Sequence, residues 1–109
     1  YYELVTNSGR QVAMTGNKNG WCVMDLQEAD GTSRCDRYTC QDQGISRGCA
    51  DIYSASLDCQ WVDITGVPDG DYRVRVTTNP YRSFNELSFE NNVAEVGIQI
   101  AGDSVTLLD

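Results

Sequence analysis

Two residues of this chain have the chemistry to build a cofactor from side chains alone. Lys18 is the only lysine in the sequence and stands four residues before Cys22. Tyr53 lies between Cys49 and Cys59, in a loop that these two cysteines could close, and a strand-like run follows directly. An amine nucleophile and an oxidisable phenol are therefore the first candidates for chemistry.

Length and charge limit the kinds of function to consider. A chain of 109 residues has room for one domain, and we expect a single domain over residues 1–109. Its net charge of −8 argues against nucleic-acid binding, which needs clustered Lys and Arg. No apolar run is long enough to span a bilayer. A basic partner is easier to accommodate, because an acidic surface attracts cations and repels anions; a role in solvation alone is the alternative.

The cysteines point to an oxidising compartment. Five cysteines in a short chain are typical of a secreted protein, and their odd number leaves one thiol without a partner inside the chain. A zinc framework is not indicated, because the chain has no Cys-x-x-Cys motif and no histidine. The chain begins at Tyr1 without a Met, which suggests a processed product or a fragment.

The elements that must position these residues are strands. Apolar and polar residues alternate, and turn residues separate the runs, so we expect strands over residues 1–6, 11–14, 20–26, 59–65, 72–77, 93–100 and 105–108. Short turns between successive strands predict an all-β fold, an antiparallel β-sandwich. Residues 27–58 are polar and irregular and hold three of the cysteines, which predicts a long loop region stapled by disulfides.

One strand shows its two faces clearly. Tyr72, Val74 and Val76 alternate with Arg73 and Arg75. Because successive side chains of a strand point to opposite faces, we expect the three apolar residues to face inward. The two arginines should then face solvent or an acidic neighbour.

Several segments in order along the chain resemble the carboxy-terminal catalytic region of the lysyl oxidase family. They read GNKNGWCVMD at 16–25, QGISRGC at 43–49, DIY at 51–53, DCQWVDIT at 58–65, GDY at 70–72 and NNV at 91–93. The string at 58–65 is the most specific of them, and the resemblance covers nearly the whole chain.

The resemblance implies a copper amine oxidase that converts peptidyl lysine to an aldehyde and so crosslinks extracellular proteins. The cofactor of the family is lysine tyrosylquinone, and its precursors would be Lys18 and Tyr53. The quinone carbonyl would condense with the substrate amine, and a nearby carboxylate would take the α-proton. Asp51 is the candidate for that carboxylate, because it is close to Tyr53 in the sequence.

The chain departs from the family pattern at the copper site. Family members hold copper with histidines upstream of the matching segments, whereas this chain has no histidine, and Asn17 stands where a histidine is common. Imidazole is the ligand that suits copper(II), so copper is expected only if histidines lie on an upstream segment. The copper-binding segment is thus absent from residues 1–109.

The resemblance also implies how the cysteines pair. It implies disulfides between Cys49 and Cys59 and between Cys22 and Cys35. Cys40 would be unpaired within the chain, with its partner on an upstream segment; a free buried thiol is the alternative.

A second site is suggested by the family's calcium-binding loop. The matching positions here are Glu86, Ser88, Glu90, Asn91 and Asn92. Carboxylate and amide oxygens suit calcium, but a solvated acidic turn is an equal alternative.

Three functions remain open. The first is part of a secreted lysyl-oxidase-like enzyme. The second is a non-catalytic secreted β-sandwich module for structure, adhesion or extracellular assembly, which the absence of histidine favours. The third is a calcium-dependent binding domain.

Overall fold

The computed structural model describes residues 1–8, 10–17, 20, 22–31 and 33–108. Its internal contacts divide the chain into two compact units. We call Tyr1–Lys18 with Cys59–Asp109 the sheet unit, and Asn19–Asp58 the disulfide unit. Whether they act together as the single predicted domain stays a prediction.

The described residues form strands, turns and irregular structure without a helix. The strands are β1 (Tyr2–Thr6), β2 (Val12–Thr15), β3 (Gln27–Glu28), β4 (Cys49–Ala50), β5 (Gly70–Thr77), β6 (Val93–Ala101) and β7 (Ser104–Leu107). Together with the disulfides, they confirm the predicted all-β fold with a disulfide-stapled irregular region. No described residue lies in a helix long and apolar enough to cross a membrane.

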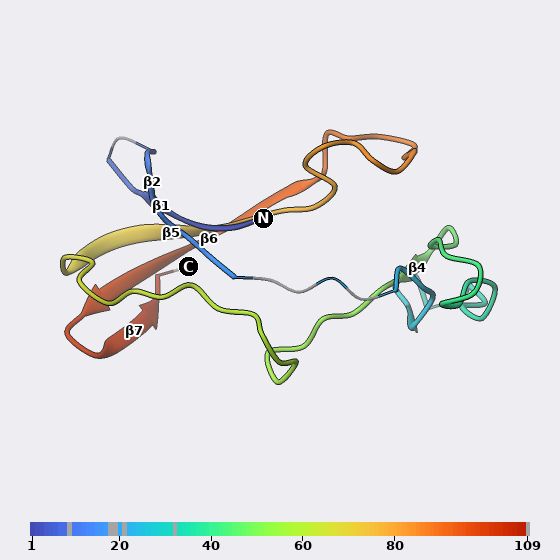
Figure 1. Cartoon of the computed structure of the whole chain (residues 1–109), viewed down its shortest axis with the longest axis horizontal. Helices are drawn as coiled ribbons and strands as arrows, with labels where there is room; N and C mark the ends of the chain where they lie inside the picture. Colours follow the sequence, from blue (N-terminus) through green and yellow to red (C-terminus); the bar gives the residue numbers. More distant parts are fainter. Residues whose placement is uncertain (9, 18–19, 21, 32, 109) are drawn as a thin grey trace. The chain divides into compact units, whose positions relative to one another are not determined.

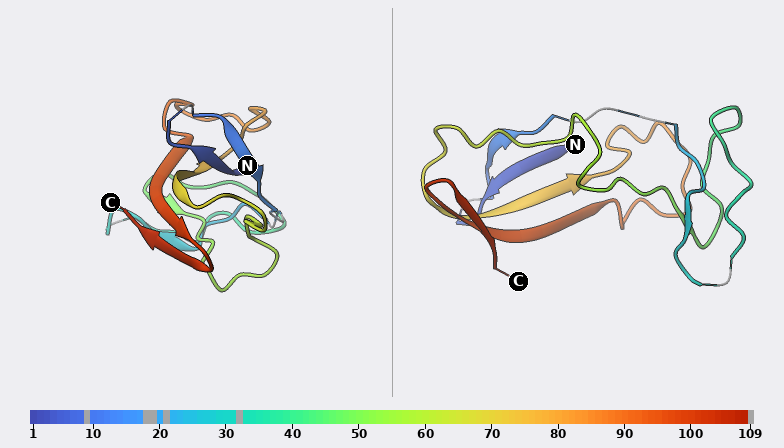
Figure 2. Two further views of the ribbon diagram at one scale, coloured as in Figure 1. Left: turned by 90° about the vertical axis from the view of Figure 1, so that its left-hand side faces the viewer. Right: turned by 90° about the horizontal axis from the view of Figure 1, so that it is seen from below.

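The sheet unit is built on one antiparallel sheet with the strand order β2-β1-β5-β6-β7. The two longest strands, β5 and β6, lie side by side, as Figures 1 and 2 show. Apolar and polar residues alternate strictly in both strands, as expected of strands with one buried face. The strands predicted over residues 72–77 and 93–100 are therefore confirmed. Tyr72 is buried as predicted, and its hydroxyl donates a hydrogen bond to the Pro68 carbonyl at 2.7 Å.

The core lies on one face of this sheet. Leu4, Tyr72, Ile98 and Ile100 form a buried cluster. Residues that oppose one another across an antiparallel pair share a face, and the register pairs Tyr72 with Ile98. This shared face explains how strands from both ends of the chain build one core.

An extended segment, residues 59–69, lies over that face. Val62, Ile64 and Val67 from this segment pack against the buried cluster. The prediction of a strand over residues 59–65 is wrong, because within it only Trp61 makes a bridge, to Asn17. Its alternation comes from packing onto the sheet face, which has the same period of two as a strand.

The disulfide unit holds the short hairpin of β3 and β4 and otherwise irregular chain. Gly48 precedes β4 with φ of 78°, and a Cβ there would collide with the side chains of Asp30 and Ser33. A strand was expected over residues 20–26, but residues 22–26 have no strand pairing. Their main chain bonds instead to Tyr38, Gln43 and Ala50.

Candidate functional site

The structure locates one of the two cofactor candidates. Tyr53 is half-buried and follows β4 by three residues. A turn comes directly after it, closed by the Leu57 amide donating to the Ser54 carbonyl at 3.0 Å. Asp51 is also half-buried. This segment leads from the hairpin to the end of the disulfide unit.

Lys18 lies outside the described residues, so its pairing with Tyr53 stays a prediction. The residue before it, Asn17, is held within the sheet unit by main-chain hydrogen bonds. The Asn17 amide donates to the Trp61 carbonyl at 2.6 Å, and the Trp61 amide donates to the Asn17 carbonyl at 3.0 Å. A Cβ on Gly16 would come within 2.8 Å of Tyr2 and Val62 side-chain atoms. Only a glycine therefore lets the chain approach this closely before Lys18.

The cysteines pair differently from the pairing that the resemblance implied. Disulfides join Cys22 to Cys40 and Cys35 to Cys49, with Cα separations of 5.1 and 5.6 Å. Cys59 is the free, exposed cysteine. The expected Cys49–Cys59 and Cys22–Cys35 bridges are thus not formed, and Cys40 is not the unpaired residue.

The physical reason is the fold of the disulfide unit. The Ala29 amide donates to the Gly48 carbonyl and the Asp25 amide to the Tyr38 carbonyl, which draws three stretches of chain together. All four bonded cysteines belong to this unit, whereas Cys59 belongs to the sheet unit. A link to an upstream segment through Cys40 is excluded while Cys40 is bonded to Cys22. The Cys35–Cys49 bond fixes β4 through Cys49, four residues before Tyr53.

Asp25 is a buried carboxylate at the centre of the disulfide unit, with an exposed fraction of 6%. It accepts hydrogen bonds from the Ser46 amide at 2.8 Å and hydroxyl at 2.7 Å, and from the Arg37 and Tyr38 amides at 3.1 and 3.3 Å. Burial is the largest influence and raises its pKa, but these hydrogen bonds together outweigh burial and hold the pKa below the ordinary value. No local pattern around Asp25 predicts this role.

Side-chain hydrogen bonds hold the predicted calcium loop, and one of them comes from outside it. Asn79 and Asn92 each donate from Nδ2 to Glu86 Oε2 at 2.6 Å, and these hydrogen bonds lower the Glu86 pKa. The Ser88 hydroxyl accepts the Glu90 amide at 3.2 Å. Glu86 and Asn92 are therefore in contact, through the amide nitrogen of Asn92. Asn79 was not among the predicted ligands.

The other face of the sheet carries a charged ladder. The register aligns Glu3, Arg75 and Glu95 across β1, β5 and β6. Glu95 contacts Arg75 Nε at 2.8 Å, Arg73 Nε at 3.0 Å and Arg10 Nη2 at 2.6 Å. Of the two surroundings expected for Arg73 and Arg75, solvent or an acidic neighbour, the structure shows the acidic neighbour. The arginines, led by Arg10 and Arg75, hold the Glu95 pKa at about 2 against opposing desolvation.

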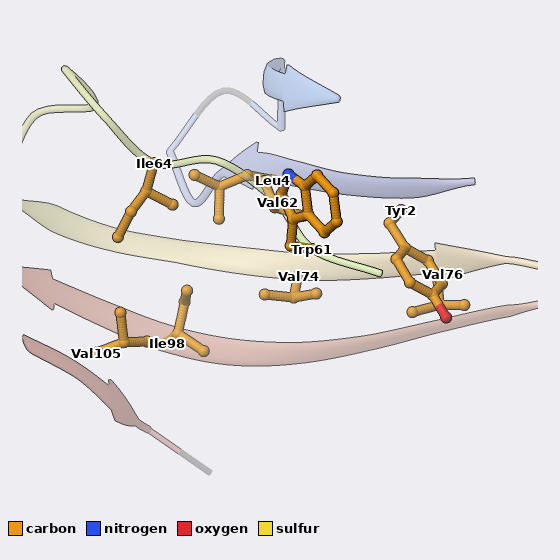
Figure 3. Close-up of a pocket in the computed structure, with 9 residues that line it drawn as sticks. All are labelled: Tyr2, Leu4, Trp61, Val62, Ile64, Val74, Val76, Ile98 and Val105. Carbon is orange, nitrogen blue, oxygen red and sulfur yellow. The ribbon is translucent and has the colours of Figure 1, made fainter. Parts of the chain in front are cut away.

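An apolar groove opens on the core face, which the sequence did not predict. Its volume is about 340 Å³, and it is lined by Tyr2, Leu4, Trp61, Ile64, Ile98 and Val105 among others. Figure 3 shows residues of the extended segment facing residues of the strands across it. The lining includes no charged residue. Such a groove suits apolar groups and not the amine of a lysine.

The described residues include no group of three or more His, Cys, Asp or Glu side chains that could hold a metal ion. With no histidine anywhere in the sequence, the residues present do not fit copper(II).

Comparisons with known proteins identify the family of the chain. The lysyl oxidase family model matches residues 1–109. Lysyl oxidase homolog 4 from Mus musculus is 39% identical over 110 residues, covering 98% of this chain and 14% of that protein. Lysyl oxidase homolog 3A from Danio rerio is 38% identical, with the same coverage. Protein-lysine 6-oxidase from Gallus gallus is 36% identical over 104 residues, covering 94% of this chain and 24% of that protein.

This chain therefore corresponds to only a small part of the length of those relatives, yet the match runs over nearly all of its own residues and includes the segments around Lys18 and Tyr53. The chain belongs to the lysyl oxidase family.

Proposed function

We propose that this chain is part of the catalytic domain of a secreted lysyl-oxidase-like amine oxidase. The enzyme would oxidise peptidyl lysine to an aldehyde that crosslinks extracellular proteins. The observation that carries the proposal is the family match over residues 1–109, which contains both Lys18 and Tyr53. One relative is named protein-lysine 6-oxidase, which fits a protein substrate.

In this proposal Tyr53 and Lys18 are the precursors of a lysine tyrosylquinone, which would supply the carbonyl that takes a substrate amine. Two features of the structure support the assignment. The Cys35–Cys49 bond fixes the strand that precedes Tyr53. The main-chain bonds between Asn17 and Trp61 fix the residue before Lys18.

Asp51 is the proposed acceptor of the substrate's α-proton. A carboxylate is a suitable base for this step if it lies within hydrogen-bond reach of the proton. Asp51 is half-buried and two residues from Tyr53, so both belong to the stretch that follows β4. An Asp51→Asn variant should keep its substrate affinity and lose turnover.

In this proposal, copper is bound by histidines that lie outside residues 1–109. The residues of this chain do not fit copper(II), and no step of the proposal assigns them to it. Their part is to supply the two precursors and to hold the segments that carry them.

Matched tyrosine variants test this proposal in the copper-loaded protein at its full natural length. Tyr53→Phe should abolish hydrogen peroxide release with a lysine-containing peptide, because phenylalanine lacks the phenol. Tyr38→Phe is the control, since Tyr38 also belongs to the disulfide unit and bonds to Asp25 through its main chain. Lys18→Arg should also be inactive. Full activity of Tyr53→Phe would rule out the assignment.

A non-catalytic secreted module is the second candidate, for structure, adhesion or extracellular assembly. The absence of histidine favours it. The sequence encoded next to this chain separates the two candidates. A closely spaced histidine cluster supports the oxidase, whereas a linker without histidine supports the module.

Calcium binding by the Glu86 loop is a further proposal. What supports it is that Glu86 and Asn92 are neighbours and that both side chains carry oxygen atoms; calcium would have to displace the hydrogen bond that Asn92 Nδ2 donates to Glu86 Oε2 at 2.6 Å. Calcium should raise the melting temperature of the wild type and not that of Glu86→Ala. An equal rise in both would show that calcium does not use this loop.

A further inference from the structure

The rings of Tyr1 and Tyr81 are in contact on the surface of the sheet unit. Their centroids lie 5.7 Å apart and their planes cross at 71°, which is an edge-to-face arrangement. Tyr81 is 75% exposed and Tyr1 is 46% exposed. Two accessible phenols therefore stand side by side, although they are far apart in the sequence.

Main-chain hydrogen bonds hold Tyr1 beside the end of β5. The Tyr1 nitrogen donates to the Thr77 carbonyl at 2.6 Å, and the Thr77 amide donates to the Tyr1 carbonyl at 2.8 Å. Thr77 is the last residue of β5 and precedes Tyr81 by four residues. The pairing of β1 with β5 thus brings Tyr1 to the start of the loop that carries Tyr81.

A tight turn holds Tyr81. The Arg82 amide donates to the Asn79 carbonyl at 3.0 Å, which closes a β-turn. Pro80 and Tyr81 are its two corner residues, and proline suits the first corner because its φ is preset. Asn79 Oδ1 also accepts the Phe84 amide at 3.2 Å. These bonds limit how far the Tyr81 ring can move away from Tyr1.

The other two tyrosines of the sheet unit have different surroundings. The Tyr2 hydroxyl donates to Gln60 at 2.7 Å, and its side chain lines the apolar groove. Tyr72 is buried and donates to the Pro68 carbonyl. An oxidant in solution therefore reaches Tyr81 more easily than it reaches Tyr72.

We propose that Tyr1 and Tyr81 are a modification site at which an internal dityrosine crosslink forms. The oxidant is of the peroxidase class and consumes hydrogen peroxide. Each phenol gives up one electron and one proton to become a phenoxyl radical, and the two radicals couple through ring carbons ortho to oxygen. Each coupled carbon then passes its hydrogen to the phenol oxygen as the ring becomes aromatic again. One C–C bond replaces two C–H bonds, and one hydrogen peroxide is reduced to two waters.

The contact suits this coupling because the two rings are already neighbours. Exposed side chains change rotamer within nanoseconds, so the ortho carbons can meet without a change of fold. The product would join the start of β1 to the loop between β5 and β6. The proposal is independent of the proposed oxidase activity, since the oxidant comes from outside the chain.

Peptide mapping after oxidation tests the proposal on the protein at its full natural length. The protein is treated with a haem peroxidase and hydrogen peroxide, and the monomer is separated and digested. We expect one fluorescent species in which the peptides containing Tyr1 and Tyr81 are joined and have lost two hydrogen atoms. With an effective concentration in the millimolar range and protein at about 1 µM, coupling within a molecule should exceed coupling between molecules by about a hundredfold.

Tyr1→Phe and Tyr2→Phe are the matched variants, because neighbouring tyrosines share a peptide. Tyr1→Phe should abolish the joined species, and Tyr81→Phe should do the same. Tyr2→Phe should retain it, since the Tyr2 side chain lines the groove.

Three results would overturn the proposal. One is dityrosine that forms only between molecules. Another is a joined species that persists in Tyr1→Phe. The third is recovery of the Tyr81 peptide unjoined from the monomer after the hydrogen peroxide has been consumed.

Discussion

Reduction of the two disulfides should unfold the disulfide unit and leave the sheet unit folded. The two units differ in what stabilises them. The sheet unit has a buried cluster of four residues, Leu4, Tyr72, Ile98 and Ile100. In the described part of the disulfide unit, Asp25 is the only buried residue. That unit therefore depends on covalent links to an unusual degree.

The stabilisation expected from the two disulfides follows from the lengths of the loops that they close. The sequence separations are 18 and 14 residues, and each such crosslink stabilises by about 3 kcal/mol on the chain-entropy model. The two loops share residues 35–40, so the two contributions do not simply add. A unit of about 40 residues usually needs crosslinks to fold, so losing even one contribution should be enough to unfold it.

Hydrogen exchange measured by mass spectrometry is the assay. After reduction and alkylation, the amides of Asp25, Leu26 and Ala29 should exchange rapidly, because they donate to carbonyls inside the disulfide unit. Peptides from β5 and β6 should keep their protection. Cys59→Ser is the control, since Cys59 is free and its loss should change neither unit.

Two results would refute this reasoning. One is that the disulfide unit keeps its amide protection after complete alkylation of all five cysteines. The other is that β5 and β6 lose protection together with it, since the two units would then unfold as one.

Three further predictions concern polar contacts. The Glu95 pKa is about 2 against an ordinary value of 4.5, so its contribution to stability is present above about pH 4.5 and is lost as the pH falls toward 2. The melting temperature of Glu95→Gln should therefore lie below that of the wild type at pH 7 and approach it near pH 2. Asp25 also has a lowered pKa, so Asp25→Asn should be destabilising at neutral pH and should raise the fraction of mispaired disulfides after oxidative refolding, as scored by non-reducing peptide maps. Tyr72→Phe removes the hydrogen bond to Pro68 and should cost about 1 kcal/mol in urea unfolding; an unchanged midpoint would show that water replaces it.

The sheet could be predicted largely from the sequence because its strands alternate strictly. The expected runs at 72–77 and 93–100 correspond to β5 and β6, and an acidic neighbour was one of the two surroundings expected for Arg73 and Arg75. Residues 59–65 show where this logic fails. Alternation of apolar and polar residues indicates that one side of a segment is buried. It does not indicate whether the main chain pairs with a neighbouring strand.

The disulfide unit could not be predicted because its order comes from contacts that leave no local pattern. Asp25 bonds to residues 12 to 21 positions away, and no periodic signal marks such contacts. The pairing of Cys22 with Cys40 follows from the same fold, since cysteine spacing alone does not define connectivity. The apolar groove was missed because its walls come from segments far apart in the sequence.

The most direct measurement is a peptide map of the copper-loaded, full-length protein. Lys18 is the only lysine in this stretch, so any crosslink through a lysine amine here must use it. The proposed oxidase predicts a single species in which the peptides containing Lys18 and Tyr53 are covalently joined and stain as a quinone. Recovery of both peptides separate and unmodified would contradict it.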